Sequence, residues 1–99
     1  MLMRPAVFGV VGMAIAASCA TAAESPPGAS SCTGCHAASA SVETPVPRLA
    51  GLPALRIAEE MRAFRAGTRP GTIMPRLAKG FSDDEIAALA AWYAAQPAP

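Results

Sequence analysis

The sequence predicts a small all-α domain with three to four helices. Apolar side chains recur at helical spacing in residues 53–67 and again after residue 82, whereas no segment alternates between apolar and polar residues as a half-buried strand would. The 99 residues contain no internal repeat. A chain of this length rarely builds a sufficient core from its side chains alone, so we expect an additional staple.

Residues 1–22 have the features of a secretory signal peptide. Arg4 gives the start a positive charge, residues 6–17 are apolar, and residues 20–22 (Ala-Thr-Ala) form a small-residue cleavage site. The apolar run is short for a membrane span, which disfavours a retained anchor. A lipoprotein acylated at Cys19 is also disfavoured, because no large aliphatic residue stands just before it. We therefore expect an exported protein without a stable membrane span after cleavage.

Residues 23–30 are predicted as a linker and residues 31–99 as a single domain. The linker contains a Pro-Pro-Gly sequence, which discourages regular structure. A short helix should then lead into Cys32. Residues 37–51 are rich in Ser, Pro and Thr, and we predict a loop there.

A longer helix is predicted from Pro53, a residue suited to a first helical position, to Gly67. The apolar side chains spaced along one side of this helix are Ile57, Met61 and Phe64. Residues 68–80 hold two prolines and two glycines, so they are predicted as another loop.

The last helix has the clearest start signal in the chain. Ser82 and Glu85 have the spacing of a capping box, and Phe81 and Ile86 are placed as a hydrophobic staple across it. The apolar stripe of this helix consists of Ile86, Leu89 and Tyr93, and Trp92 extends it.

The segment Cys32-Thr33-Gly34-Cys35-His36 carries the most specific chemistry. Two cysteines at this spacing on a tight turn can each form a thioether to a porphyrin vinyl group, and the histidine that follows then lies under the iron as its proximal ligand. A covalent porphyrin would also serve as the staple that a short chain needs. The pattern therefore predicts one covalently attached haem c.

Two other readings of the cysteine pair are weaker. A zinc site needs a second pair of ligands, but the third cysteine, Cys19, lies in the predicted leader, and His36 is the sole histidine. A thioredoxin-like dithiol would lie in an alternating pattern of strands and helices, which the sequence lacks. Since haem is attached to c-type cytochromes outside the cytoplasmic membrane, the haem reading and the leader both indicate the bacterial periplasm.

The sixth iron position separates an electron carrier from a haem enzyme or sensor with an open iron. Met61 lies on the apolar side of the predicted second helix, where a thioether is ordinary core filling. Met74 precedes Pro75, and the residue before a proline favours extended backbone, which would project its side chain from the chain path. Met74 is therefore the predicted sixth ligand. Methionine and histidine together raise the reduction potential and close the iron to substrates.

The order of these features resembles a class I cytochrome c. The haem motif is followed by Pro47-Arg48-Leu49-Ala50-Gly51, then by Met74-Pro75 and a capped C-terminal helix. The resemblance implies that the carbonyl of Pro47 accepts a hydrogen bond from His36, that Leu49 packs on the ring, and that the last helix crosses the first beside the haem. It covers essentially the whole mature chain.

Residues 64–69 and 72–86 are similar to the cytochrome subunit of flavocytochrome c sulfide dehydrogenase, in its short monohaem form. Ala37 departs from the glycine that is common after the haem histidine, a change that does not touch the iron ligands. The resemblance implies a partner subunit that contains FAD, oxidises sulfide and passes electrons to the haem subunit, which hands them to another carrier. The alternative is a free-standing monohaem carrier between membrane complexes. In either role the chain has no catalytic residue of its own.

Charge excludes one class of partner. Residues 23–99 hold seven basic and seven acidic side chains, because Arg4 is the one charged residue of the predicted leader. Nucleic-acid binding needs a clustered basic face, so we expect protein redox partners and no nucleic acid.

Overall fold

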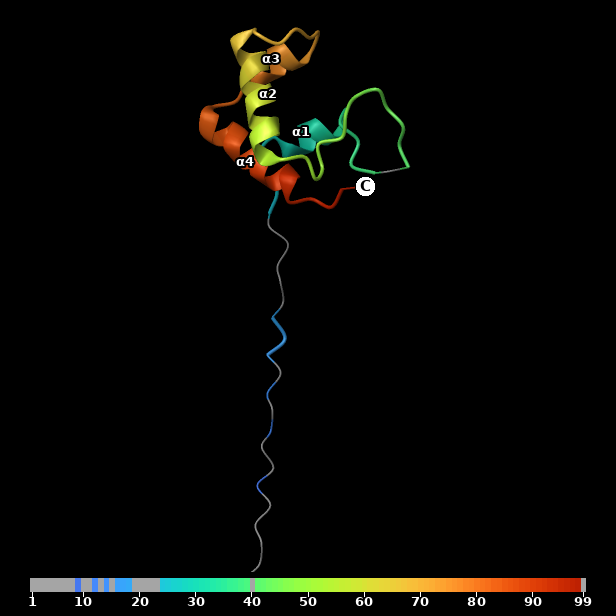
Figure 1. The fold of residues 1–99 in the computed structure, drawn as a ribbon, viewed down its shortest axis with the longest axis vertical. Helices are drawn as coiled ribbons and strands as arrows, with labels where there is room; N and C mark the ends of the chain where they lie inside the picture. Colours follow the sequence, from blue (N-terminus) through green and yellow to red (C-terminus); the bar gives the residue numbers. More distant parts are fainter. Residues whose placement is uncertain are drawn as a thin grey trace, which may run out of the picture.

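The computed structural model describes residues 24–39 and 41–98, together with residues 9, 12, 14 and 16–18. Within these ranges the helices are α1 (Ala29–Thr33), α2 (Ala54–Ala66), α3 (Met74–Ala78) and α4 (Asp83–Ala94) (Figure 1). None of the described residues is in a β-strand, so the predicted all-α class is confirmed. Cys19 and most of the predicted leader lie outside the described residues. The first helix begins at Ala29, inside the segment that was predicted as a linker.

In the part of the chain that the structure describes, no helix has the length and apolar character needed to cross a bilayer.

The helix predicted from residue 53 to residue 67 is present as α2. Pro53 is its N-cap, and Gly67 ends it in the left-handed conformation (φ 78°), donating its N–H to the carbonyls of Ala63 and Phe64. Glycine suits this position because a side chain would disfavour a positive φ. Ile57 and Ala58 are the buried residues of the helix, and α2 packs against both α3 and α4 (Figure 1).

The loop predicted for residues 68–80 was wrong in part, because it contains α3. Pro75 lies in the first turn of this helix, where a residue without an N–H leaves no helical hydrogen bond unmade. The backbone N–H groups of Arg76 and Leu77 both donate to the carbonyl of Ile73, at 3.0 and 3.1 Å. Ala78 is fully buried and anchors the short helix (0% exposed). A proline disfavours a helix interior, but Pro75 stands in the first turn, where it is compatible with a helix.

The predicted capping box at the start of α4 is confirmed. The hydroxyl of Ser82 accepts from the Glu85 N–H at 3.2 Å, and the Glu85 carboxylate accepts from the Ser82 N–H at 3.1 Å. The predicted stripe is also confirmed, since the buried residues of α4 are Ile86, Leu89, Ala90 and Tyr93. Trp92 is half-buried and packs against this core.

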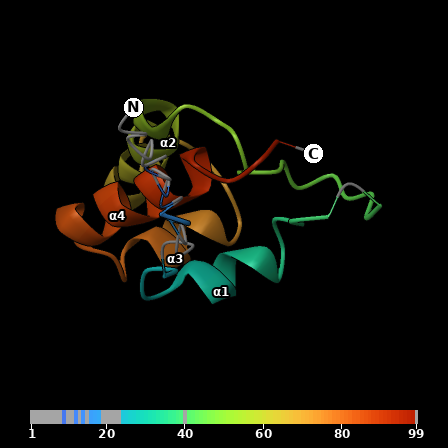
Figure 2. The same cartoon turned by 90° about the horizontal axis from the view of Figure 1, so that it is seen from below.

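The core joins α1, α2 and α4 through one cluster. Its buried members are Ala29, Ile57, Ala58, Ile86, Leu89, Ala90 and Tyr93. The turn into α1 lies against Phe81, two residues before α4, because an added Cβ at Gly28 (φ 89°) would be 2.6 Å from the Phe81 ring. Figure 2 shows α1 at the margin of the group formed by the other three helices. The chain therefore holds the cysteine segment at the edge of its core.

Candidate haem site

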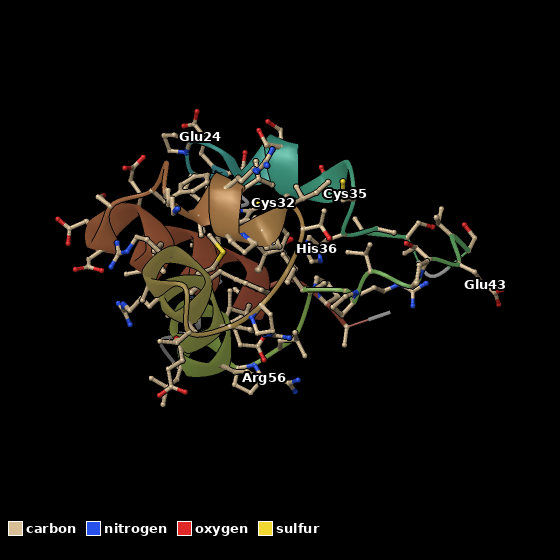
Figure 3. The ribbon with its side chains drawn as sticks, turned by 90° about the horizontal axis from the view of Figure 1, so that it is seen from above. Glu24, Cys32, Cys35, His36, Glu43 and Arg56 are labelled. Atoms are coloured by element: carbon tan, nitrogen blue, oxygen red, sulfur yellow. The ribbon has the colours of Figure 1, made fainter. Side chains whose placement is uncertain are left out.

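The cysteine segment forms the end of α1 and the turn that follows it. Cys32 lies inside the helix, half-buried, with its sulfur 3.6 Å from the carbonyl of Gly28, whereas Cys35 is exposed. The backbone carbonyl of Cys32 accepts from the N–H groups of Cys35 and His36, at 3.1 and 2.8 Å, which closes the tight turn. Both cysteines are free thiols. Figure 3 shows Cys32, Cys35 and His36 grouped around the C-terminal end of α1.

His36 is held by the loop that follows it. Its Nδ1 lies 2.5 Å from the carbonyl oxygen of Pro47. A carbonyl only accepts hydrogen bonds, so Nδ1 carries a proton and donates it, which leaves Nε2 as the nitrogen that can bind a metal. A neutral imidazole in this tautomer is the form in which histidine binds a metal through Nε2.

An apolar cavity of about 290 Å³ adjoins His36. Leu49 and Ala50 line it from the loop, and Trp92 and Tyr93 line it from α4. The remaining lining residues are Thr33, Ala37, Ala38, Gln96 and Pro97. The structure thus brings Leu49 and His36 to one cavity.

These residues fit a covalently attached porphyrin. The donor set comprises two unpaired thiols and an imidazole whose Nε2 is free, next to a mostly apolar space. Among the described residues, no group of three or more His, Cys, Asp and Glu side chains could hold a metal ion by itself. Two thiols and one imidazole in this order are the donor set that a covalently attached haem requires.

Met74 and Met61 occupy different surroundings. Met61 packs against the core cluster from α2. Met74 is half-buried at the first residue of α3 and does not line the cavity beside His36. The extended backbone expected for Met74 was wrong, because the residue is helical. Met61 thus packs against the core as predicted, whereas Met74, the predicted iron ligand, does not belong to the core cluster.

Tyr93 has a contact that the apolar pattern did not reveal. Its hydroxyl donates to the carbonyl of Ala29 at 2.6 Å and so ties α4 to α1. Burial, together with the neighbouring Cys32, raises the pKa of Tyr93 to about 12. Burial also raises the pKa of the Cys32 thiol, although a hydrogen bond with Tyr93 opposes this. The sequence did hold one signal for this contact: a tyrosine on the buried side of a helix needs a hydrogen-bond partner for its hydroxyl.

We expect Tyr93→Phe to destabilise the haem-loaded protein by about 1 kcal/mol at pH 7, because the buried Ala29 carbonyl loses the hydrogen bond from the Tyr93 hydroxyl. Burial keeps the folded pKa of Tyr93 above its unfolded value of 10.0, so this tyrosine's contribution is complete below pH 10 and declines as the pH rises through the folded pKa. Denaturant unfolding at pH 7, 9 and 11 measures both effects.

Thr68→Val is the matched control for this prediction. It removes an exposed hydroxyl that donates to the carbonyl of Ala63 at 3.3 Å, and it should leave the stability nearly unchanged. Tyr93 is the sole tyrosine of the chain, so no other phenol contributes to the alkaline limb. Equal stability of Tyr93→Phe and the wild type at pH 7 would contradict the prediction.

The chain matches no family model. It is 34% identical over 105 residues to a "thiosulfate dehydrogenase electron acceptor" of Thiomonas intermedia (strain K12), a match that covers 99% of this chain and 48% of the relative. A protein of the same name from Stutzerimonas stutzeri (strain A1501) is 40% identical over 75 residues, covering 74% of this chain and 35% of the relative. The chain therefore spans about half or less of the length of these two relatives.

A third relative is similar in size to the matched region. "Cytochrome c-554(548)" of Halomonas halodenitrificans (strain ATCC 12084 / NCIMB 8669) is 35% identical over 69 residues, which cover 66% of this chain and 83% of the relative. No sulfide dehydrogenase is among these three proteins. The match extends over most of a whole cytochrome, and the helical fold agrees with it. The chain belongs to the family of small c-type cytochromes, which hold haem c covalently.

Proposed function

We propose that this chain is a periplasmic monohaem electron carrier that accepts electrons from a dehydrogenase of inorganic sulfur compounds. The observation that carries the proposal is His36, whose Nδ1 is bonded to Pro47 directly after the two thiols. Bound haem supplies a one-electron couple at its iron. No residue of this chain is needed as a general acid, base or nucleophile.

Each predicted site residue has one task in this proposal. Cys32 and Cys35 would form the thioethers, and His36 would bind the iron through Nε2. Leu49, which shares the cavity with His36, packs against the ring and keeps water from it. Met74 would be the second protein ligand of the iron, and its thioether would raise the reduction potential and exclude substrates. Pro47 orients His36 through the hydrogen bond at Nδ1.

The surface around Met74 supports a role in transient docking. Ile73 and Leu77 are 58% and 48% exposed, and residues four apart share one face of a helix. Arg76 and Lys79 are exposed on the same short segment, so charge borders these apolar side chains. Brief redox encounters use small interfaces of this kind. We place the contact with the electron donor here and expect acidic groups on the donor.

Thiosulfate dehydrogenase is the proposed electron donor. Two relatives carry the name of its electron acceptor, and one of them matches 99% of this chain. A second candidate is the FAD-containing subunit of a sulfide dehydrogenase, which the similarity of residues 64–69 and 72–86 to its cytochrome subunit favours. Both donors leave the cytochrome with the same task, one-electron acceptance followed by transfer to another carrier.

Stopped-flow reduction of the oxidised haem-loaded protein tests the donor. The protein is mixed anaerobically with thiosulfate and catalytic amounts of thiosulfate dehydrogenase, or with sulfide and the flavoprotein subunit. We expect reduction by thiosulfate to accelerate in proportion to the dehydrogenase, compared with thiosulfate alone. Reduction at the rate of thiosulfate alone would contradict this donor. Acceleration by the flavoprotein above the rate of sulfide alone would assign the second candidate.

A further inference from the structure

The hydrogen bond that orients His36 comes from a segment without regular structure. Pro47 is exposed, and the described residues between His36 and Leu49 (37–39 and 41–48) contain neither helix nor strand. Exposed segments of this kind open at low free energy. Even so, the carbonyl oxygen of Pro47 lies 2.5 Å from Nδ1 of His36. The contacts of the neighbouring residues therefore decide how firmly this carbonyl is held.

Arg48, the residue directly after Pro47, makes such contacts. Its Nε and Nη2 donate to the carbonyl of Ser39 at 3.4 and 3.2 Å, and Nη2 also donates to the carbonyl of Val42 at 2.7 Å. The N–H of Val42 donates to the same Ser39 carbonyl at 3.3 Å, so Arg48 binds across a turn. Pro47, which bonds to His36, and Arg48, which bonds to Ser39, are adjacent in the chain. The two ties together close the loop at its base.

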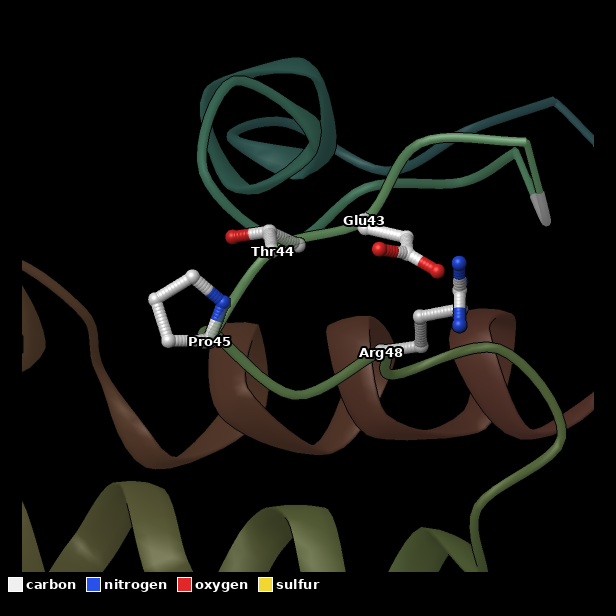
Figure 4. Close-up of a pocket in the computed structure, with 4 residues that line it drawn as sticks. All are labelled: Glu43, Thr44, Pro45 and Arg48. Carbon is white, nitrogen blue, oxygen red and sulfur yellow. The ribbon is translucent and has the colours of Figure 1, made fainter.

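Arg48 also lines an open depression of about 550 Å³ with Glu43, Thr44 and Pro45 (Figure 4). The carboxylate of Glu43 points toward the guanidinium in this view. The guanidinium is a planar group with a fixed fork of donors, so it can bond two carbonyls at once. A lysine keeps the charge but presents it as a single flexible point. Arg48→Lys therefore separates geometry from charge.

We infer that Arg48 is a positioning residue for the proximal ligand: by tying Ser39 and Val42, it holds the Pro47 carbonyl on Nδ1 of His36. This inference rests on the proposed role of His36 at the iron. A hydrogen bond from Nδ1 to a carbonyl makes the imidazole a stronger electron donor, which favours ferric iron. Weakening that bond raises the reduction potential. Removing the positive charge of Arg48 acts in the opposite direction: a positive charge disfavours the more positive ferric state, so its loss lowers the reduction potential.

The test compares Arg48→Lys and Arg48→Gln with the wild type as haem-loaded proteins. Arg56→Lys is the matched control, because Arg56 is an exposed arginine of α2 paired with Glu60 at 3.2 Å. Proton NMR of the reduced protein follows the exchange of the His36 Nδ1 proton with solvent. Spectroelectrochemistry gives the potential. We expect faster exchange in both Arg48 variants, and in Arg48→Lys a raised potential of up to about 59 mV, a tenfold change in the one-electron equilibrium.

The outcomes are distinguishable. The positioning role would be overturned if Arg48→Lys kept the wild-type potential and the wild-type exchange rate of the His36 Nδ1 proton. It would also be overturned if the potential fell in Arg48→Gln alone, because loss of the charge explains that result by itself. If Arg48→Gln fails to mature, Arg48→Lys decides by itself. Absence of a His36 Nδ1 proton in the wild type, or ligation by another residue, would overturn the proposed role of His36 and this inference with it. A merely structural role would lower the unfolding midpoint and leave exchange in the folded protein unchanged.

Discussion

Replacing both Cys32 and Cys35 with alanine should abolish covalent haem and, with it, the cooperative fold. In the described part of the chain the buried hydrophobic residues number eight, and four of these are alanines. The larger four are Ile57, Ile86, Leu89 and Tyr93. Burying a side chain of that size contributes about 1.5–3 kcal/mol, which is too little to order a chain of this length without a staple. Helix α1 joins this core through Ala29, one turn from Cys32.

The measurement is a haem stain on a denaturing gel, after expression in the periplasm of a host with the c-type maturation system. Circular dichroism of the same sample reports the fold. Thr33→Ala is the control inside the same segment, because the Thr33 hydroxyl is exposed and bonds only locally, to the Ser30 carbonyl at 2.9 Å. This control should retain haem. Covalent haem in the double variant, or its loss in Thr33→Ala, would contradict the proposed attachment.

Single cysteine variants extend the same experiment. Each should retain one thioether and shift the main visible band of the reduced haem to longer wavelength, because one vinyl group then stays conjugated with the ring. Cys32 is half-buried and beside Tyr93, whereas Cys35 is exposed. We therefore expect the Cys32 variant to lose more stability than the Cys35 variant. Equal losses would show that burial at Cys32 does not matter for the loaded protein.

Local signals in the sequence were sufficient for most of the fold. The capping box at Ser82 and the Gly67 stop depend on a few neighbouring residues, so the boundaries of α2 and the start of α4 were predictable. Helix α3 was not, because Pro75 is compatible with both a loop and a first helical turn, and the choice is decided by the burial of Ala78 in the folded chain. Helix propensity depends on the local sequence and does not include this packing against the rest of the chain.

The candidate site divides in the same way. Haem attachment could be predicted from the cysteine segment alone, because the residues that carry this chemistry are five consecutive positions. The contact of His36 with Pro47 joins residues eleven apart, and it was expected only from the resemblance to class I cytochromes. The bonds of Arg48 and Tyr93 were not expected at all, because each depends on which backbone carbonyl the folded chain places within reach. The spacing of apolar residues predicts which face of a helix a side chain occupies. It does not predict which atom that side chain contacts.

Replacing Met74 with alanine should remove the weak far-red band of sulfur-to-iron charge transfer from the oxidised spectrum. It should also lower the reduction potential by about 0.1 V or more, since axial ligands set haem potentials over about 0.8 V. Met74 begins α3 and lies outside the packed core cluster, so its loss should not remove the fold. Low-temperature absorption and spectroelectrochemistry of the haem-loaded variant measure the two effects.

Met61→Leu is the matched control for Met74→Ala. Met61 packs against the core cluster, and leucine conserves its volume, so the control should keep both the far-red band and the potential. A band that persists in Met74→Ala and disappears in Met61→Leu would move the sixth ligand to α2. A band absent from the wild type would leave the iron open, and the chain would then bind small ligands at the haem. Only loss of the band in Met74→Ala alone agrees with a carrier whose iron is closed by α3, because an iron held on both sides exchanges electrons without exchanging ligands.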